Sequence, residues 1–225
     1  MKLFDINKKD KKTEPTYFYT KEEFEKYDEF IINEFGNYTE VMHEIVSPDI
    51  HLDVLIIPPS ETENYYKLIT MGMGAYKMNV PKELKKYNLE RAELVLYLPP
   101  TWNIKSDKKE DYWPIGTLKT IARLPIIENS WLGFGHTVSS DSKNSSYASN
   151  TKFCSMLLLS ALNKEYNKVT LDLNNKKIIY FYQLFPLYEE ELEYKLKTST
   201  QDFLNLIDDK DITPVIDINR KNYCI

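Results

Sequence analysis

Three residues in one short stretch have side chains whose types and spacing could do chemistry. His51 and Asp53 lie two residues apart, so on a strand their side chains point to the same face. If the preceding segment forms a hairpin with Val46 opposite His51, Glu44 lies opposite Asp53 and joins that face. Two carboxylates and an imidazole in this register could bind a metal ion or act as acid and base. As an alternative function, this cluster predicts a metal-assisted hydrolase that uses Glu44, His51 and Asp53. A scaffold or regulatory module of unknown ligand is a further alternative.

The register of that hairpin decides the prediction. A slip of one residue removes Glu44 from the face, because side chains alternate along a strand. A polar face with alternating charge is also typical of a half-exposed hairpin that has no catalytic role. We therefore favour a structural role for these three residues.

The rest of the chain has no recognisable active site. His43, His51 and His136 are the three histidines, and their spacing fits no zinc pattern. The chain also lacks the phosphate-loop, dinucleotide-binding and nucleophile-elbow motifs. Cys154 and Ser155 lie in an apolar run with no histidine nearby in sequence, so neither is a good nucleophile, and Cys154 is expected to be buried. The sequence predicts no catalytic residues, no cofactor and no metal.

Composition limits the partners and the compartment. A net charge of −5 argues against a general nucleic-acid binder, which needs a basic face, and it suits a basic protein partner. Two cysteines form no disulfide framework, and we expect neither a signal peptide nor a membrane span, so the chain reads as cytoplasmic. No linker divides it. We expect a flexible N-terminal arm over residues 1–19 and a single domain over residues 20–225.

The pattern of elements predicts an α+β fold with a mixed, mostly antiparallel sheet and helices packed on it. Thr20 and Glu23 form a capping box, which predicts a helix whose buried stripe holds Phe24, Tyr27, Phe30 and Ile31. Strands are expected at residues 40–46, 51–57, 65–71, 92–98, 153–159, 169–173 and 177–184, with a short helix or turn at 81–88 and an edge strand at 212–218. Acidic residues after Pro186 and a cap at Ser199 predict two C-terminal helices.

The sequence is organised around residues 112–139. Apolar residues at three- and four-residue spacing predict a helix that begins near Pro114 and ends at Leu124, because the residue before Pro125 is pushed out of the helical region. Gly133 and Gly135 predict a fixed bend that places His136 at the start of a strand.

A surface for recognising another protein is the remaining prediction. Trp102, Trp113, Trp131 and Phe134 could supply aromatic anchors of the kind that dominate interfaces. Residues 139–151 are rich in Ser and Asn and predict a long exposed loop. A strand that starts at His136 beside this loop could leave one edge free to accept an extended segment of a partner.

Several short motifs together resemble the suppressor of fused (SUFU) domain family. They are Ile121-Ala122-Arg123-Leu124-Pro125 followed by Trp131-Leu132-Gly133-Phe134-Gly135-His136-Thr137, His51-Leu52-Asp53-Val54 with Pro58-Pro59, Thr70-Met71-Gly72-Met73, Arg91-Ala92-Glu93-Leu94 with Tyr97-Leu98-Pro99-Pro100-x-Trp102, and Pro186-Leu187-Tyr188-x-x-Glu191-Leu192. The resemblance runs from about residue 38 to residue 220 and implies a SUFU-like fold.

The resemblance implies a non-catalytic binder. Animal members hold a transcription factor through an extended peptide beside the strand that matches Gly135–Val138. This maps partner binding onto Leu124, Trp131, Phe134, Gly135, His136, Thr137 and Val138. The chain matches the first lobe of those members and has His136 where they have an acidic residue, so their peptide is not implied. Its short form resembles bacterial members implicated as immunity proteins (antitoxins) of polymorphic toxin systems, whose toxins are often nucleases.

Overall fold

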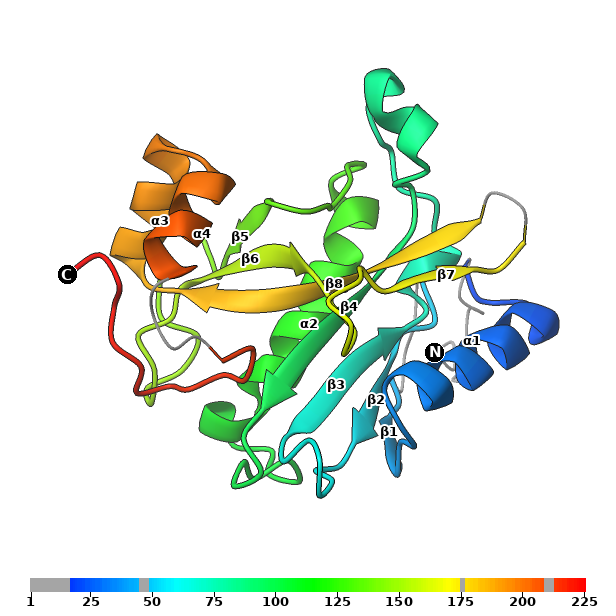
Figure 1. The fold of residues 1–225 in the computed structure, drawn as a ribbon, viewed down its shortest axis with the longest axis horizontal. Coiled ribbons are helices and arrows are strands. Elements are labelled where there is room, and N and C mark those ends of the chain that lie inside the picture. Colours follow the sequence, from blue (N-terminus) through cyan, green and yellow to red (C-terminus); the bar gives the residue numbers. More distant parts are fainter. Residues whose placement is uncertain (1–16, 45–48, 175–176, 209–212) are drawn as a thin grey trace, which may run out of the picture.

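The structure, a computed structural model, describes residues 17–44, 49–174, 177–208 and 213–225 (Figure 1). In chain order, the elements are α1 (Lys21–Glu34), β1 (Glu40–Met42), β2 (Asp53–Ile57), β3 (Tyr66–Met71), the 3-10 helices η1 (Met73–Ala75) and η2 (Lys82–Tyr87), β4 (Ala92–Leu98), α2 (Lys109–Ile127), β5 (Thr137–Ser139), β6 (Ser155–Ser160), β7 (Thr170–Asp172), β8 (Ile178–Leu187), α3 (Glu189–Lys197) and α4 (Thr200–Asp208).

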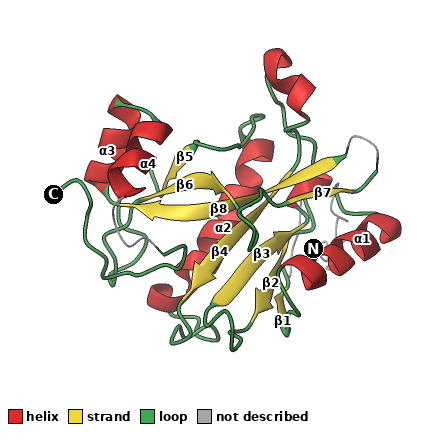
Figure 2. Cartoon of the chain, viewed as in Figure 1, coloured by secondary structure: helices red, strands yellow, loops and turns green. Residues whose placement is uncertain are grey.

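The described strands form one mixed sheet in the order β1-β2-β3-β4-β8-β6-β5, with β7 also paired to β8 (Figure 2). The β4–β8 pair is parallel and the other pairs are antiparallel. β6 and β7 lie along the same side of β8, one against each half of that long strand. The predicted α+β class, with a mostly antiparallel mixed sheet and packed helices, is confirmed.

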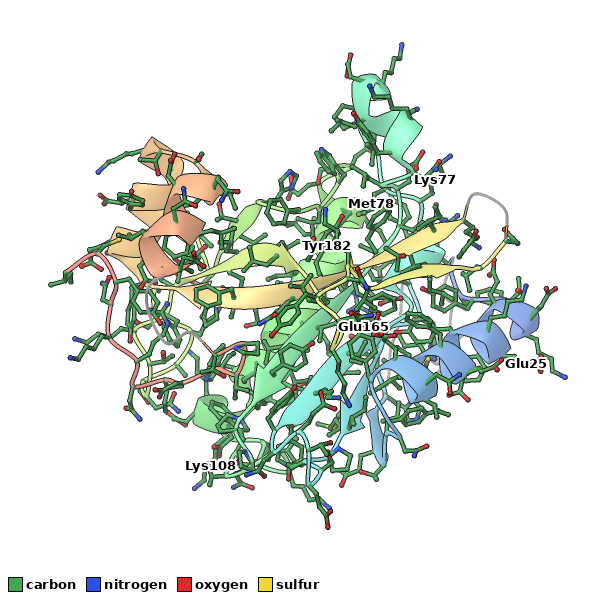
Figure 3. All side chains as sticks on the ribbon, viewed as in Figure 1. Glu25, Lys77, Met78, Lys108, Glu165 and Tyr182 are labelled. Atoms are coloured by element: carbon green, nitrogen blue, oxygen red, sulfur yellow. The ribbon has the colours of Figure 1, made fainter. Side chains whose placement is uncertain are left out.

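Two helical layers cover the two faces of this sheet. The even-numbered residues of the central strands, such as Leu94 and Leu184, pack against α2, which crosses behind the sheet in Figure 1. Met78, at the base of the projecting η2 segment, and Tyr182 on β8 belong to this layer (Figure 3). Odd-numbered residues face the other way, where Phe181 packs under α1 and Phe185 packs under α3 and α4. The odd face thus carries α1 at one end and the α3–α4 pair at the other.

Helix α1 begins where the capping box predicts. Thr20 Oγ1 accepts from the Glu23 backbone N–H, and the Glu23 carboxylate accepts from the Thr20 backbone N–H. Tyr27 and Ile31 are fully buried, as predicted, but Phe24 is 40% exposed and its inclusion in the buried stripe is wrong. Phe24 lies in the first turn, where the helix extends past the core and beside an open groove.

Helix α2 is longer than predicted at both ends. It starts at Lys109 and continues through Pro125 to Ile127, so the predicted end at Leu124 is wrong. Pro125 is buried in the last turn, and the carbonyl of Leu124 still accepts from the Glu128 N–H. Packing of the last turns against the sheet outweighs the local bias that proline imposes on the residue before it.

One predicted strand does not form among the described residues, and two other predictions concern the start of the chain and the 139–151 loop. The segment 213–218 forms no strand among the described residues; Val215 makes a single parallel bridge to Tyr97, and residues 211–212 lie outside the described residues. The predicted arm over residues 1–19 falls largely outside the described residues, but its last three residues contact the domain, with the Tyr17 N–H donating to the Asp49 carbonyl at 3.0 Å. The 139–151 loop is mostly exposed but buries Ala148 and Thr151.

Candidate functional site

Strand β5 ends the sheet and leaves one edge open. It pairs with β6 alone among the described strands, in the register Val138↔Met156. The Leu158 N–H donates to the His136 carbonyl and the Ser140 N–H donates to the Cys154 carbonyl, so positions 136, 138 and 140 face β6. Because backbone groups alternate in an antiparallel ladder, the N–H and C=O groups of Thr137 and Ser139 point away from β6. That edge is a template for one more strand.

A tight bend positions the start of β5. Gly135 has φ +83°, and a Cβ there would lie 2.8 Å from Thr200 Oγ1 on α4, so no other residue fits without strain. The rings of Trp131 and His136 meet edge to face, with centroids 4.4 Å apart. The predicted bend at Gly133 and Gly135 and the strand start after His136 are confirmed.

His136 is held in its neutral form. Burial lowers its pKa below the ordinary value of 6.5, and the positive charge of Lys195 on α3 lowers it further, while a backbone hydrogen bond with Trp131 opposes these effects. At pH 7 the imidazole is therefore uncharged, and the strand start carries neither the positive charge of an imidazolium nor the acidic group that the family resemblance places there.

A shallow groove runs between β5 and α2. Val138, Ser139 and Ser140 form one wall, the α2 residues Tyr112, Gly116, Thr117 and Ile121 form the other, and Trp113 and Tyr147 close the base, around a volume of about 230 Å³. That is below the roughly 300–1,000 Å³ typical of small-molecule pockets. The size suits one or two side chains of a partner segment laid along the edge.

The 139–151 loop is tied to the start of α2. Asp141 Oδ1 accepts from the backbone N–H groups of Lys143 and Ser145, and the resulting hydrogen bonds hold the pKa of that carboxyl below its usual range. Asn150 Nδ2 donates to the Glu110 carbonyl at 2.9 Å. The loop therefore lies at one end of the groove in a defined conformation.

The structure brings together part of the predicted partner-binding set. Gly135, His136, Thr137 and Val138 form the bend and the edge strand, Trp131 packs on His136, and Phe134 is half exposed beside them. Leu124 is half-buried and packs against the core one turn along α2 from Ile121. Whether these residues bind a partner stays a prediction.

Of the two aromatic residues at the base of the groove, the sequence analysis missed Tyr147 and wrongly expected Trp113 to be a surface anchor. Tyr147 stacks on Trp113 with centroids 5.3 Å apart, and Trp113 is 5% exposed. Trp113 is thus buried and is no surface anchor. A lone aromatic residue in a Ser- and Asn-rich loop was the available signal for Tyr147, because such a side chain needs an apolar surface to cover.

The predicted polar cluster forms in a different register. β1 and β2 pair Met42 with Val54, which places His43 and not Glu44 opposite Asp53. His43 Nδ1 lies 3.0 Å and His51 Nε2 lies 3.4 Å from the same oxygen, Oδ2 of Asp53. Glu44 turns to the other face and pairs with Arg123 on α2. The predicted set of Glu44, His51 and Asp53 is therefore wrong by one residue, since one step along a strand reverses the face.

The described ranges contain neither a metal-binding cluster nor a membrane-spanning helix. No group of three or more His, Cys, Asp or Glu residues within those ranges could hold a metal ion. No helix in that part of the chain is long and apolar enough to cross a bilayer.

A second buried acid explains two of the sequence motifs. Glu93 on β4 is fully buried and accepts from the hydroxyls of Tyr19 and Thr70, both at 2.6 Å, and from the backbone N–H groups of Gly72 and Gly74. Burial raises its pKa to about 7, although all four donors favour the charged form. These donors join the β3–η1 turn and the segment before α1 to the centre of the sheet, so the role of these motif residues is structural.

Comparison with known proteins identifies the family. An α+β domain whose sheet ends in the edge strand β5, and whose described residues form no recognisable catalytic constellation, is the class of protein that the fold and the site define. The family model described as Suppressor of fused protein (SUFU) matches residues 48–221, more than three quarters of the chain. The chain belongs to the SUFU family, as the sequence motifs indicated.

Relatives and solved structures agree with this assignment. An uncharacterized protein of Ureaplasma parvum serovar 3 is 28% identical over 210 residues, covering 92% of this chain and 98% of that protein. A structure described as a SUFU homolog from Neisseria gonorrhoeae FA 1090 matches with a TM-score of 0.60 and 15% identity, covering 91% of this chain and 96% of that one. A structure described as the Sufu-Fu complex matches with a TM-score of 0.59 and 14% identity, covering 89% and 90% of the two chains. A structure described as Drosophila Suppressor of Fused matches with a TM-score of 0.51 and 16% identity, covering 76% of this chain and 42% of that one.

Proposed function

We propose that this chain is a non-catalytic protein-binding module that takes an extended segment of its partner onto the free edge of β5. The observation that carries the proposal is the outward backbone of Thr137 and Ser139 beside the groove against α2. Main-chain hydrogen bonds along such an edge provide affinity, and a neighbouring groove selects alternate side chains of the added strand. The related structure described as the Sufu-Fu complex supports a protein as the partner.

The partner we propose is a toxin, and the role is that of a bacterial immunity protein acting in the cytoplasm. The relatives in Ureaplasma parvum and Neisseria gonorrhoeae are bacterial, and this chain matches each of them over nearly its whole length. Single-domain bacterial members of the family are the ones implicated as antitoxins. The net charge of −5 favours encounter with a basic toxin such as a nuclease, because opposite charges steer association. Trp131, Phe134, His136 and the 139–151 loop would cover the active site or substrate groove of the toxin.

Binding partners encoded by neighbouring genes provide the test. We expect the purified chain to form a stable complex with one of these gene products, and co-production to restore growth that the same product inhibits when made alone. If none of the neighbouring gene products binds, the immunity role is wrong.

A matched pair of variants at one position tests the β5 edge. Ser139→Pro removes the outward N–H that an added strand needs, whereas Ser139→Ala keeps it and removes only the hydroxyl. We expect Ser139→Pro to weaken the complex at least about tenfold and Ser139→Ala to leave it within about twofold. A partner that binds Ser139→Pro and the unchanged chain equally well uses another surface, and the strand-addition part of the proposal then fails.

A further inference from the structure

A second groove lies at the opposite end of the sheet from β5. It runs between the first turn of α1 and the strands β1 to β3, and its volume is about 410 Å³, within the range of about 300–1,000 Å³ of small-molecule sites. Its walls are largely aromatic and aliphatic, formed by Phe18, Tyr19, Phe24, Tyr38, Val41 and Leu55. Because β1 and β5 are at the two ends of the strand order, this groove is independent of the proposed partner-binding edge.

The polar end of this groove is a buried carboxylate. Asp53 is 1% exposed and lines the groove, with Oδ2 facing His43 and His51. Its other oxygen, Oδ1, is buried and has no hydrogen-bond partner among the described residues. A buried acceptor without a donor costs about 1–3 kcal/mol, and more when it is charged. The two imidazoles are largely exposed at the rim, so they can move aside for a ligand without disturbing the core.

The local charges favour a cation as that missing donor. Among the described residues that line the groove, Asp53 is the one acid and there is no lysine or arginine, so a positive group in the groove meets a carboxylate and no competing cation. Phe18 and Phe24 are 59% and 40% exposed, and their faces are open to a positive group. Ammonium and guanidinium groups are attracted to aromatic faces as well as to carboxylates.

We propose that this groove is a binding site for a small organic cation, an ammonium or guanidinium group carried on an aromatic or aliphatic body. The charged group would donate to Asp53, with the body packed between Phe18, Phe24 and Tyr38. A divalent metal ion does not fit, because over the described ranges the chain has no group of three or more suitable ligands.

The three histidines of the chain make the site easy to observe. His43 and His51 are at the groove, whereas His136 is at β5 and serves as an internal reference. We would titrate the full chain with 2-phenylethylammonium and, separately, with the neutral 2-phenylethanol, and follow the imidazole signals by NMR. The signals would be assigned with the His43→Gln and His51→Gln variants.

The proposal expects a clear order of affinities. The cation should shift the His43 and His51 signals but not that of His136, with a Kd of about 1 mM or lower, and the alcohol should bind at least about tenfold more weakly. Asp53→Asn should bring the cation to the affinity of the alcohol, whereas Asp172→Asn, an exposed acid on β7, should change nothing.

Three outcomes would overturn it: no shift at His43 and His51 up to about 10 mM cation, equal binding of cation and alcohol, or unchanged binding by a folded Asp53→Asn variant. The comparison of cation with alcohol uses the unchanged chain, so it decides the matter even if Asp53→Asn fails to fold. Phe24→Ala removes an exposed aromatic wall without touching the core and should weaken both probes, the cation by the larger factor.

Discussion

Arg220 and Glu191 form a buried, two-pronged ion pair that holds the C-terminal segment against the start of α3. The two terminal nitrogens of Arg220 donate to separate oxygens of Glu191, each at 2.6 Å, and Glu191 is fully buried. Backbone N–H groups of Tyr188 and Tyr223 donate to the same carboxylate. The guanidinium carbon lies between 4.6 and 5.3 Å from the ring centroids of Phe153, Phe185, Tyr188 and Tyr223. Planar stacking and bidentate pairing are both properties of arginine that lysine lacks.

Replacing Arg220 should be among the most destabilising changes outside the apolar core. Arg220→Met leaves the Glu191 charge buried without its partner, and we expect a loss of about 3–5 kcal/mol in the free energy of unfolding, measured by urea denaturation. Arg220→Lys should cost less, because the charge stays while the second hydrogen bond and the stacking are lost.

A double variant separates pairing from packing. Glu191→Leu combined with Arg220→Met removes both charges, so it should be more stable than Arg220→Met alone. If the double variant instead loses the sum of the two single losses, the pair is not coupled and this account of the C-terminal segment is wrong.

Glu93 should give the protein a stability that falls as pH rises. Its pKa is raised from an ordinary value of 4.5 to about 7 in the folded chain, mainly by burial. Between these values the unfolded chain has released the proton while the folded chain still holds it, so unfolding becomes more favourable with increasing pH. This loss of stability is complete above about pH 7 and amounts to on the order of 3 kcal/mol.

The Glu93→Gln variant tests this slope. Glutamine does not titrate and its carbonyl can still accept from the Gly72 and Gly74 N–H groups, so the decline between about pH 4.5 and 7 should be smaller than in the unchanged chain. The exposed Glu29→Gln substitution is the matched control and should leave the slope unchanged. Identical slopes for Glu93→Gln and the unchanged chain would show that Glu93 is not the titrating group.

Much of the fold follows from local patterns in the sequence. The capping box at Thr20 and the apolar run that predicts a strand over residues 92–98 are signals contained in a few neighbouring residues, and the structure confirms them. The prediction for the end of α2 failed for the opposite reason. The preference against helix before Pro125 is local, whereas the packing that overrides it comes from β2, β3 and β4, which are distant in sequence.

The candidate sites were harder to predict from the sequence than the fold, because they depend on the register of strand pairing. A difference of one residue in the β1–β2 pairing exchanged Glu44 for His43, and nothing in the composition of either strand fixes that register. The motif residues Glu93 and Glu191 are fully buried and hold the sheet and the C-terminal segment in place. The residues that indicate the family are in this respect largely those that maintain the fold, which is why they did not reveal a binding surface.

Replacing each of two glycines, Gly72 and Gly116, by alanine should change the stability of the fold in opposite directions. Gly72 has φ +123°, and a Cβ there would lie 1.9 Å from the His51 carbonyl oxygen, so Gly72→Ala must displace backbone. We expect it to lower the free energy of unfolding by at least about 2 kcal/mol. Gly116 is in α2 with space for a methyl group beside Tyr112, so Gly116→Ala should raise stability by about 0.5–1 kcal/mol.

Thermal or urea unfolding of the two variants checks this pair of predictions. Because Gly116 also lines the groove at β5, its alanine variant reports on function as well. A more stable Gly116→Ala chain that binds its partner less tightly would place a partner side chain in that groove. A Gly72→Ala chain as stable as the unchanged one would contradict the close approach of β3 to the segment before β2.

The lowered pKa of His136 should depend in part on Lys195. Burial is the larger cause and the charge of Lys195 is the second, so Lys195→Met should raise the His136 pKa without restoring the ordinary value. An NMR titration of the imidazole measures it directly, and Lys82→Met, on the exposed η2 segment, is the control. In the unchanged chain the unfolded state binds a proton at higher pH than the folded state, so stability falls as pH drops through about 6.5. Lys195→Met should lessen that fall, and a His136 pKa that stays fixed would mean that burial against Trp131 alone keeps the imidazole neutral at the start of β5.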